Sequence, residues 1–379
     1  MEDAIPLRRL RRAFAGQRVL VTGHTGFKGA WLSEWLLELG AQVAGFSLSP
    51  PTEPALFDQL GLANRLESQI GDIRDADALA EAVERIAPHF VFHLAAQPLV
   101  RLSYREPVAT YATNVLGTVH LLEAVRASAR PCIVVAVTTD KCYENKEWLH
   151  GYREEDPLGG FDPYSSSKAA AELVVAAYRQ SFFKGPTSGV RPVCVASARA
   201  GNVIGGGDWA QDRIVPDCIR ALDAGERIAV RNKVATRPWQ HVLEPLSGYL
   251  ALAMAMAEAN GKGAARETND LCSAFNFGPR LESNRSVADL VEEILKHRPG
   301  EWVDKSDPEA PHEAGRLNLV TDKAFHLLDW QPVWDFQQTV AETIQWYSQA
   351  RSGSIPEFTR SQLRSYLAAA AAAGLPWTQ

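Results

Sequence analysis

The sequence predicts an α/β protein whose first part is a doubly wound parallel sheet and whose second part is a smaller, mixed α/β lobe. Three observations lead to this fold class: apolar runs that alternate with helical stretches, a glycine-rich turn directly after the first run, and a change in character near residue 201. Strands that alternate with helices are typical of a parallel sheet that is covered on both faces.

Five short segments are rich in Val, Ile, Phe and Ala and lack polar alternation, as expected for strands that are buried on both faces. They read RVLVTG, QVAGFSL, HFVFHLAA, CIVVAVTTD and PVCVASARA. In the intervening segments apolar residues recur at spacings of three and four, which predicts helices. We expect these helices over residues 31–40, 76–86, 113–129 and 165–181.

The character of the chain changes after Gly201, where GNVIGGGDW is typical of a loop. Residues 238–259 then predict a helix that returns to the first domain, and a strand-like SAFNFGP and a helix at 287–296 follow. The run LAAAAAAGLP predicts a terminal helix, because alanine is the best helix former. We therefore expect a Rossmann-type dinucleotide-binding domain over residues 1–200, with a returning segment at about 229–259, and a substrate-binding lobe over 201–228 and 260–379.

Composition excludes several classes of protein. A hydrophobic content of 46% is too high for a disordered chain, and a net charge of −6 over 379 residues provides no general field for nucleic acid. No apolar run reaches the roughly 18–20 residues of a membrane helix, and the arginine-rich N-terminus is not a signal peptide. Five widely spaced cysteines without a CxxC motif predict a reduced, cytoplasmic chain that has no metal site.

The turn after the first strand, GHTGFKG, places Gly23, Gly26 and Gly29 three residues apart, just before a helix. Glycine allows the backbone to turn sharply and to approach a pyrophosphate closely, and the helix N-terminus offers free N–H groups to the phosphates. Because this turn follows the first strand of a βαβ unit, it predicts a dinucleotide site. Lys28 either adds charge to the phosphate site or faces solvent.

The end of the second strand, FSLSPPTE, has no acid directly after the strand to hold the adenosine ribose. Ser47, Ser49 or Thr52 could bind a ribose hydroxyl instead. No arginine is nearby to hold a 2′-phosphate, which favours NAD over NADP. Asp72 and Ile73 follow a later strand and suit an adenine pocket, although Asp72 could equally be the N-cap of the next helix.

Tyr164 and Lys168 form a Y-x-x-x-K motif at the start of a predicted helix, where a spacing of four places both side chains on one face. A nearby ammonium group favours the phenolate, which can take the proton of a sugar hydroxyl while hydride leaves the same carbon. Thr139, at the end of the preceding strand, is positioned to hydrogen-bond that hydroxyl. The two motifs together predict an oxidoreductase step.

Together with GHTGFKG, these residues resemble the extended short-chain dehydrogenase/reductase family. Several stretches resemble one branch of it, the CDP-glucose 4,6-dehydratases: GHTGFKGAWL, HLAAQPLVRLSY, TTDKCYENKEW, DPYSSSKAAAE, GNVIGGGDWAQDRIVPD and RPWQHVLEPLSGYLALA. The resemblance spans roughly residues 18–347. It implies an intramolecular hydride relay on a nucleotide-linked glucose, with tightly bound NAD, in the synthesis of deoxysugars such as those of lipopolysaccharide O-antigen.

The resemblance also implies roles for Asp140 and Lys141, because the elimination of water across C5 and C6 of the sugar needs an acid and a base. Asp140 would protonate the C6 hydroxyl, and Lys141 would remove the C5 proton that the C4 ketone has made acidic. Burial favours the neutral form of both groups, as these roles require. The alternative for this pair is a surface ion pair at the end of a strand.

The resemblance implies two further sets of residues. The NAD-binding set is Gly23, Thr25, Gly26, Phe27, Lys28, Asp72, Ile73, Leu94, Ala95, Ala96, Thr138, Tyr164 and Lys168. The substrate-binding set is Gln97, Asn202, Arg213, Arg237 and Trp239, where arginine suits phosphate oxygens and Trp239 either stacks on a base or is a buried anchor. Weaker candidates are Asn276, Arg280, His312 and Arg316.

Other functions remain open at this point. A nucleotide-sugar 4-epimerase or a simple dehydrogenase could use the same scaffold, and so could a non-catalytic dinucleotide sensor. The expected partner is a nucleotide-linked glucose, with CDP-glucose favoured, and neither a nucleic acid nor a membrane. A homodimer or homotetramer is expected, because the helices at 113–129 and from residue 165 carry apolar residues on more than one face.

Overall fold

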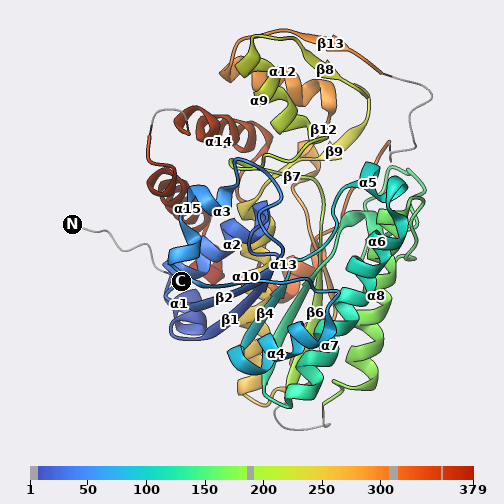
Figure 1. The fold of residues 1–379 in the computed structure, drawn as a ribbon, viewed down its shortest axis with the longest axis vertical. Coiled ribbons are helices and arrows are strands. Elements are labelled where there is room, and N and C mark those ends of the chain that lie inside the picture. Colours follow the sequence, from blue (N-terminus) through green and yellow to red (C-terminus); the bar gives the residue numbers. More distant parts are fainter. Residues whose placement is uncertain (1–6, 186–191, 307–314, 351–352) are drawn as a thin grey trace.

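The computed structural model describes residues 7–185, 192–306, 315–350 and 353–379. Its centre is a seven-stranded parallel sheet with the strand order β11-β6-β5-β4-β1-β2-β3 (Figure 1). The strands are β1 (Arg18–Thr22), β2 (Gln42–Ser47), β3 (Glu67–Ile70), β4 (Phe90–His93), β5 (Cys132–Val137), β6 (Val193–Ala200) and β11 (Ala274–Phe277). The predicted fold class, a doubly wound parallel sheet with a smaller lobe, is confirmed.

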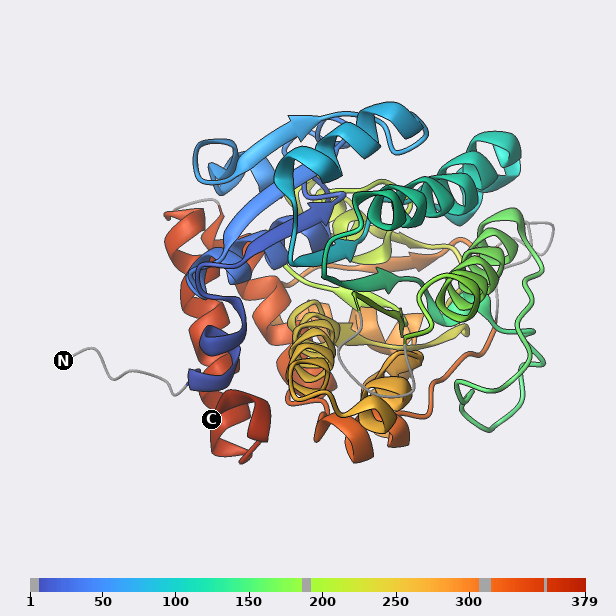
Figure 2. The same ribbon diagram turned by 90° about the horizontal axis from the view of Figure 1, so that it is seen from below.

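Helices cover both faces of the sheet, as the view from below in Figure 2 shows. One face carries α4 (Ala76–Ile86), α7 (Gly117–Ser128) and α8 (Pro163–Ser181), and the other carries α2 (Phe27–Glu38) and α10 (Leu243–Gly261). Neighbouring residues of β1 serve opposite faces: Val19 and Val21 lie in one apolar core and Leu20 lies in the other. This double burial explains why the strands show no polar alternation.

The smaller lobe lies above the carboxyl ends of the strands (Figure 1). It holds three two-stranded sheets: β7 (Val203–Ile204) with β10 (Gln240–His241), β9 (Thr236–Pro238) with β12 (Asn284–Ser286), and β8 (Ile228–Val230) with β13 (Trp302–Asp304). Its two larger helices are α9 (Ile214–Ala224) and α12 (Val287–His297).

The remaining helices connect or flank these layers. They are α1 (Arg8–Phe14), α3 (Leu56–Gln59), α5 (Val100–Arg105), α6 (Pro107–Tyr111), α11 (Ala265–Leu271), α13 (Asp322–Leu328), α14 (Phe336–Gln349) and α15 (Ile355–Ala372). Short 3-10 turns span Leu62–Asn64, Asp140–Cys142, Leu281–Ser283 and Pro376–Thr378, and a π-helical turn spans Ala112–Leu116. None of the helices in the described ranges has the length and unbroken apolar character that crossing a bilayer requires.

The division of the chain at residue 260 differs from the structure in two places. Strand β11 lies within the segment assigned to the lobe, yet it pairs with β6 as the outermost strand of the large sheet. The C-terminal segment also leaves the lobe, because the amide of Arg9 donates to the carbonyl of Gln379 at 2.7 Å. The physical reason is the same in both cases: an exposed strand edge and an exposed apolar surface of the first domain are covered by segments distant in sequence.

Candidate active site

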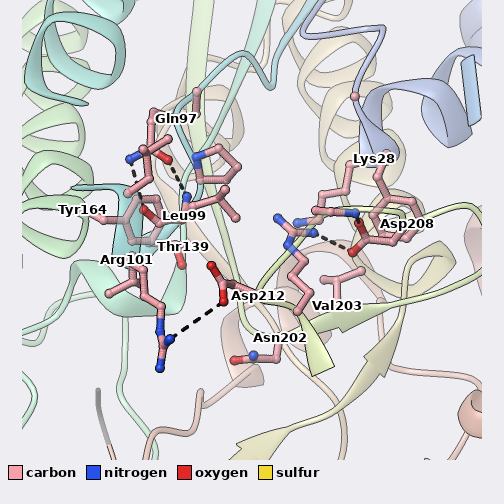
Figure 3. Close-up of a pocket in the computed structure, with 18 of the residues that line it drawn as sticks. Lys28, Gln97, Leu99, Arg101, Thr139, Tyr164, Asn202, Val203, Asp208 and Asp212 are labelled. Carbon is pink, nitrogen blue, oxygen red and sulfur yellow. Dashed lines mark hydrogen bonds and ion pairs between the residues drawn. The ribbon is translucent and has the colours of Figure 1, made fainter. Parts of the chain in front are cut away.

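A cavity of about 1940 Å³ lies between the sheet domain and the lobe. It is lined by loops that follow β1, β4, β5 and β6 on one side and by the segments around β7, α9 and β9 on the other. Figure 3 shows side chains from both sides facing the same space. Parallel sheets place ligands at the carboxyl ends of their strands, and this cavity has that location.

The three glycines of the first turn have different surroundings. A Cβ at Gly23 would lie 2.7 Å from the backbone nitrogen of Ala95, and one at Gly29 would lie 2.0 Å from the carbonyl oxygen of Gly23. A Cβ at Gly26 would meet nothing closer than 3.4 Å. Gly26 is the N-cap residue of α2, makes no side-chain hydrogen bond there, and lines the cavity. The cradle therefore fits a dinucleotide: two glycines allow tight backbone packing, and the third leaves the helix N-terminus open to a pyrophosphate.

The hydroxyls near the end of β2 are engaged within the chain. Thr25 Oγ1 lies 2.8 Å from Ser47 Oγ and donates to the carbonyl of Leu48 at 2.8 Å. Thr52 Oγ1 donates to the carbonyl of Pro54 at 2.9 Å. Ser47, Ser49 and Thr52 all line the cavity, so they lie where an adenosine ribose would be held.

Asp72 lines the same end of the cavity, and its alternative role as a helix cap is wrong. The N-cap of α4 is Asp75, whose carboxylate accepts a hydrogen bond from the helix backbone. Asp72 instead accepts from the backbone N–H and the guanidinium of Arg74, at 2.9 and 2.8 Å, and these hydrogen bonds lower its pKa. Its neighbour Ile73 is buried in the core, where it packs against Gly117.

Leu94, Ala95 and Ala96, which follow β4, line the cavity, and their contact with the cofactor stays a prediction. Gln97 follows, but its side chain is occupied within the chain. Its side-chain oxygen accepts from the amide of Leu99 at 2.6 Å, and its side-chain nitrogen donates to the carbonyl of Leu99 at 3.1 Å and to Thr110 Oγ1 on α6 at 3.0 Å. Gln97 therefore shapes the cavity wall, where Figure 3 shows it above Tyr164.

The residues that we call the catalytic wall come from the end of β5 and the start of α8: Thr139, Asp140, Lys141, Tyr164 and Lys168. Pro163 occupies the first turn of α8, and Asp162 caps the helix by accepting from the amide of Ser165 at 2.9 Å. This cap fixes the start of the helix, so that Tyr164 and Lys168 lie one turn apart on its inner face.

Burial governs the titration of both residues of the Y-x-x-x-K motif. It raises the pKa of Tyr164 to about 12, against the effect of the hydrogen bond with Thr139, and it lowers the pKa of Lys168 to about 8. Lys168 Nζ donates to the carbonyl of Val137 at 3.3 Å. The net effect of burial on the phenol is thus a raised pKa, and the lowering by the charge of Lys168 stays a prediction from the motif.

Asp140 is fully buried and forms an ion pair that excludes the surface alternative. Its Oδ1 accepts from Lys141 Nζ at 3.2 Å and from Thr139 Oγ1 at 3.0 Å. Its Oδ2 is buried and has no hydrogen-bond partner among the described residues. Lys141 Nζ also donates to Asn202 Oδ1 at 3.3 Å, and 21% of its side chain is exposed. An acid and a base therefore lie side by side next to Tyr164.

Two groups behind the catalytic wall were missed from the sequence. Glu172 lies one turn after Lys168 and forms a buried ion pair with Arg199 at 2.8 Å. It also accepts a hydrogen bond from the hydroxyl of Thr138. Burial acts to raise the pKa of Glu172, but Arg199 and the hydrogen bonds hold it below its ordinary value. The Thr138 hydroxyl, expected to bind the cofactor, is thus directed at Glu172, although Thr138 lines the cavity.

Asn114 was also missed, although it joins the loop after β4 to α8. It lies in the π-helical turn before α7, accepts from the amide of Gln97 at 2.8 Å and donates to Ser167 Oγ at 2.9 Å. Such turns are frequent at functional sites. The π-helical turn does not interrupt the helical spacing of apolar residues in the sequence. The only sign of this site in the sequence was therefore an Asn within a predicted helix.

The other substrate candidates, apart from Gln97, come from the segments after β6 and around α9 and β9. Arg213 pairs with buried Asp208 at 2.8 Å, and both Asn202 and Arg237 line the cavity. Trp239 lines it too, but is only 3% exposed and donates its indole N–H to the carbonyl of Arg285 at 3.0 Å. The buried-anchor interpretation of Trp239 is therefore the better one.

The weaker candidates lie outside this set. Asn276 is buried and accepts from the hydroxyl of Tyr143 at 2.7 Å. Arg280 and Arg316 are not among the residues that line the cavity, and His312 is outside the described residues.

Lys28 faces the cavity and not the solvent. Its Nζ lies 3.4 Å from the hydroxyl of Tyr249, and Figure 3 shows it beside Asp208. Burial, followed by the charges of Arg213 and Lys168, lowers the pKa of Lys28 to about 7. Over the described ranges, no group of His, Cys, Asp and Glu residues is placed to hold a metal ion.

Comparison with known proteins gives a consistent picture. Residues 20–343 match the family described as GDP-mannose 4,6 dehydratase. The chain is 47% identical over 337 residues to the CDP-glucose 4,6-dehydratase of Salmonella typhimurium. The aligned region covers 88% of this chain and 90% of that protein. It is 26% identical over 339 residues to the dTDP-D-glucose 4,6-dehydratase of Bos taurus, with coverage of 87% and 88%.

Solved structures share the fold at lower identity. The dTDP-glucose 4,6-dehydratase of Bacillus anthracis, determined in complex with NAD, is 23% identical with a TM-score of 0.70 and covers 88% of this chain and 97% of that chain. The UDP-glucose 4-epimerase of Thermotoga maritima, determined with UDP-glucose, is 21% identical with a TM-score of 0.71 and coverage of 88% and 99%. One fold thus serves both dehydratases and epimerases.

Proposed function

The chain belongs to the GDP-mannose 4,6-dehydratase family, and from this premise we propose that it converts CDP-glucose into CDP-4-keto-6-deoxyglucose and water. The observation that carries the proposal is the buried Asp140–Lys141 pair beside Thr139 and Tyr164. An epimerase or a simple dehydrogenase needs only the Tyr–Lys pair and the hydroxyl of Thr139. A second acid–base pair is what the elimination of water adds to that set.

NAD is the cofactor of the proposed reaction, and Gly26, the N-terminus of α2, the loop after β4 and Asp72 would hold it. When bound, NAD supplies a nicotinamide that accepts a hydride from C4 of the sugar and returns it to C6, and its positive charge favours the ionised form of Tyr164. The glycine cradle fits this group, since a Cβ at Gly26 would make only an ordinary contact, 3.4 Å from the carbonyl oxygen of Gly23, at the N-terminus of α2.

Tyr164 and Thr139 act on the C4 hydroxyl of the sugar. Tyr164 takes the hydroxyl proton as general base, and Thr139, which hydrogen-bonds Tyr164, holds the oxygen in place. Lys168 lies one turn further along α8 and supplies a positive charge to the same wall. Because burial raises the pKa of Tyr164 to about 12, the phenolate forms only when charges bound in the cavity support it.

Asp140 and Lys141 then remove water from the ketone. Transfer of one proton from Lys141 Nζ to Asp140 Oδ1, over 3.2 Å, turns the ion pair into a carboxylic acid and a neutral amine without changing the total charge. The short separation of the two atoms is the observation that supports this transfer. The acid can then protonate the C6 hydroxyl as it leaves, and the amine can take the C5 proton, whose acidity the C4 ketone has raised.

The test is to incubate the purified protein with CDP-, UDP-, dTDP- and GDP-glucose and to measure the alkaline absorbance of the 4-keto-6-deoxy product. We expect product with CDP-glucose, formed without added cofactor once the site is loaded, because the hydride returns to the same sugar. A stoichiometric build-up of reduced nicotinamide would instead identify a simple dehydrogenase. A sugar epimerised at C4 would identify an epimerase.

We also infer that the chain acts as a homodimer or larger assembly through the layer of α6 and α8. Val108, Tyr111 and Leu173 are 82%, 40% and 60% exposed on these two neighbouring helices, whereas Val175 is buried against the sheet. Apolar side chains gathered on one helical layer favour burial against another protein surface, and a two-fold symmetric copy provides a matching one. Location in the cytoplasm stays a prediction from the sequence.

A further inference from the structure

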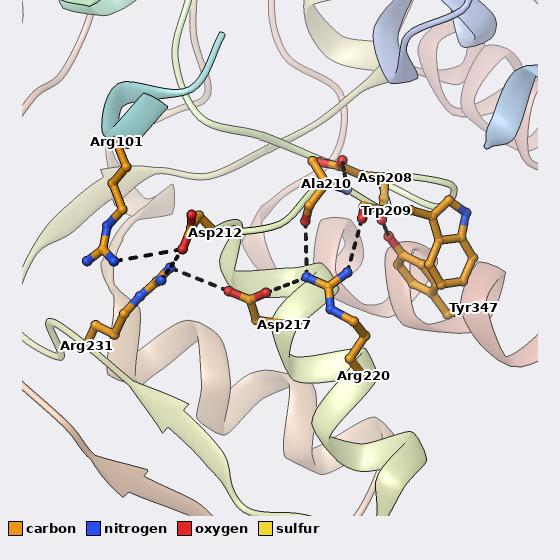
Figure 4. Close-up of polar contacts among 9 residues, drawn as sticks. All are labelled: Arg101, Asp208, Trp209, Ala210, Asp212, Asp217, Arg220, Arg231 and Tyr347. Carbon is orange, nitrogen blue, oxygen red and sulfur yellow. Dashed lines mark hydrogen bonds and ion pairs between the residues drawn. The ribbon is translucent and has the colours of Figure 1, made fainter. Parts of the chain in front are cut away.

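A group of charged side chains joins the two halves of the molecule at one side of the cavity (Figures 3 and 4). We call it the mouth cluster; its members are Arg101, Asp212, Asp217, Arg220 and Arg231. Arg101 lies on α5, after the cofactor-side loop, whereas Asp212 lies in the lobe, two residues before α9. The guanidinium of Arg101 is 3.8 Å from the carboxylate of Asp212, so this ion pair spans the space between the two sides.

Arg101, Asp212 and Arg231 all line the cavity that holds the catalytic wall. Their side chains are 38%, 38% and 39% exposed, so a bound molecule can reach them. Asp212 forms an ion pair with Arg231 as well as with Arg101, and the hydrogen bond with Arg231 lowers its pKa. An anion thus lies between two guanidinium groups that come from opposite sides of the cavity.

The lobe side of the cluster holds together without Asp212. Arg231 lies 3.5 Å from a second carboxylate, that of Asp217, which also pairs with Arg220. The guanidinium of Arg220 donates at 3.1 and 3.2 Å to two backbone carbonyls of the loop that leads to Asp212 (Figure 4). If Asp212 moved away, Arg231 would keep a partner and the loop would keep its anchor.

The backbone at Asp212 has φ = +61°, in the left-handed region that side-chain-bearing residues seldom occupy. Such a conformation persists where surrounding interactions hold it, and it is common at ligand clamps and switch regions. Asp212 therefore sits in a conformation that its two ion pairs help to maintain, and that it can leave at low cost once those arginines have another partner.

Phosphate is a better partner for this pair than a carboxylate. The arginine fork matches two phosphate oxygens, and a nucleoside diphosphate carries more negative charge than the single carboxylate of Asp212. Arg213 and Arg237 line the same cavity and add to its positive charge.

We propose that Arg101 and Arg231 form a clamp for a phosphate of the nucleotide sugar, and that Asp212 is an internal carboxylate that competes with this phosphate for both guanidinium groups. The inference rests on the proposed function for the nature of the ligand. It adds Arg101 and Arg231 to the substrate-binding residues. It also makes Asp212 a residue that weakens binding and eases release of the nucleotide product.

The test measures CDP binding by calorimetry to the protein with its resident cofactor, for the wild type, Asp212→Asn, Arg101→Gln and a control, Arg12→Gln. Arg12 is an exposed residue of α1 that does not line the cavity, so its replacement matches the charge change of Arg101→Gln away from the mouth cluster. We expect Asp212→Asn to tighten binding by about 2–5-fold, the range of a partly exposed ion pair. Arg101→Gln should weaken it by about tenfold, the usual cost of a charge-assisted hydrogen bond. The control should stay within about twofold of the wild type.

The two main variants have opposite expected signs, whereas a purely structural ion pair predicts the same sign for both. Unchanged or tighter binding by Arg101→Gln, or weaker binding by a folded Asp212→Asn, would overturn the proposal. Circular dichroism checks folding, and Arg101→Lys, which keeps the charge, should recover part of the affinity. If the wild type prefers UDP, dTDP or GDP, the proposed substrate is wrong and the variants are compared on that nucleotide. If it binds none of the four, both the function and the clamp are wrong.

Discussion

The Asp140–Lys141 pair separates the chemistry of elimination from that of oxidation. In the proposed mechanism Thr139, Tyr164 and Lys168 act with the nicotinamide in the oxidation of C4, and Asp140 and Lys141 act only in the later elimination. Asp140 Oδ2 is buried without a hydrogen-bond partner among the described residues, and Asp140 is not among the residues that line the cavity, so its donation to a substrate oxygen stays part of the proposal. Variants of single residues should therefore stop the reaction at different points.

Replacing Asp140 by Asn removes the acid but leaves the oxidation residues in place. We expect elimination to slow by about 10²–10⁴-fold, the usual contribution of one general acid. Reduced nicotinamide absorbance should then persist in a single turnover, because C4 is oxidised and C6 cannot yet accept the hydride. Near-normal turnover by this variant would contradict the assignment of Asp140.

Replacing Tyr164 by Phe is the matched control, since it removes the base for the earlier step. No reduced nicotinamide should appear in this variant, even transiently, when CDP-glucose is added. Lys141→Met should resemble Asp140→Asn and should also lose the exchange of the C5 proton with heavy water. If Lys141→Met keeps that exchange, another group removes the C5 proton.

At the scale of elements, the turn between β1 and α2 depends on close backbone contact. A Cβ at Gly29 would lie 2.0 Å from the backbone oxygen of Gly23, which no side-chain movement can relieve. We expect Gly29→Ala to lower the free energy of unfolding by about 1–3 kcal/mol and to reduce the nicotinamide content of the purified protein. Denaturant unfolding and the absorbance of released cofactor measure the two effects.

The control for this turn is Gly261→Ala at the end of α10. A Cβ there meets nothing within 4 Å and needs no left-handed backbone. This variant should keep its cofactor and change the free energy of unfolding by less than about 1 kcal/mol. Equal behaviour of the two variants would mean that the close contact at Gly29 has no effect on the turn.

Helix α10 carries a buried carboxylate that ties the C-terminal segment to the sheet domain. Glu244 accepts from the amides of Val333 and Trp334, at 3.0 and 2.7 Å, and from the hydroxyl of Tyr366 at 2.8 Å. Burial raises its pKa to about 7, from an ordinary value of 4.5. The stability that this group contributes is therefore complete below about pH 4.5 and is lost as the pH rises through 7.

The difference between wild type and Glu244→Gln should therefore depend on pH, because glutamine does not titrate. From pH 5 to pH 8 the free energy of unfolding of the wild type should fall, relative to the variant, by about 2 kcal/mol. Urea unfolding at both values measures this difference. Parallel pH profiles for the two proteins would contradict the raised pKa.

For the whole molecule, assembly through α6 and α8 is the main prediction. Light scattering at micromolar concentration should give at least the mass of a dimer, and Leu173→Glu should shift it toward the monomer. The side chain at position 173 is 60% exposed in one copy, so the new charge should lower the stability of a monomer little. It should destabilise the assembly if a partner covers that position. Leu281→Glu, at a site 67% exposed on the lobe, should leave the mass unchanged. A monomeric wild type would contradict the prediction.

Local sequence determined most of the first domain. The strands with continuous apolar character, the glycine turn and the helix at 76–86 were predictable because each depends on neighbours within a few residues. The same holds for Tyr164 and Lys168, whose spacing on one helix sets their relation. Asp140 and Lys141 were named from the family resemblance, and their place just after a strand agrees with the edge where such sheets hold their sites.

Only the tertiary structure decided the contacts between distant segments. Strand β11 completes the large sheet from a position more than 70 residues after β6, and nothing in its own sequence specifies which edge it joins. The pairing of Glu172 with Arg199, the link from Asn114 to Gln97, and the ion pair of Arg101 with Asp212 likewise join separate elements. Burial of Tyr164 is a further tertiary effect, since the desolvation that raises the pKa of its phenol depends on the whole environment. Periodicity and motif spacing depend on residues that are close in the sequence, so they can be read from it. Charge pairing and desolvation depend on which distant segments the fold brings together.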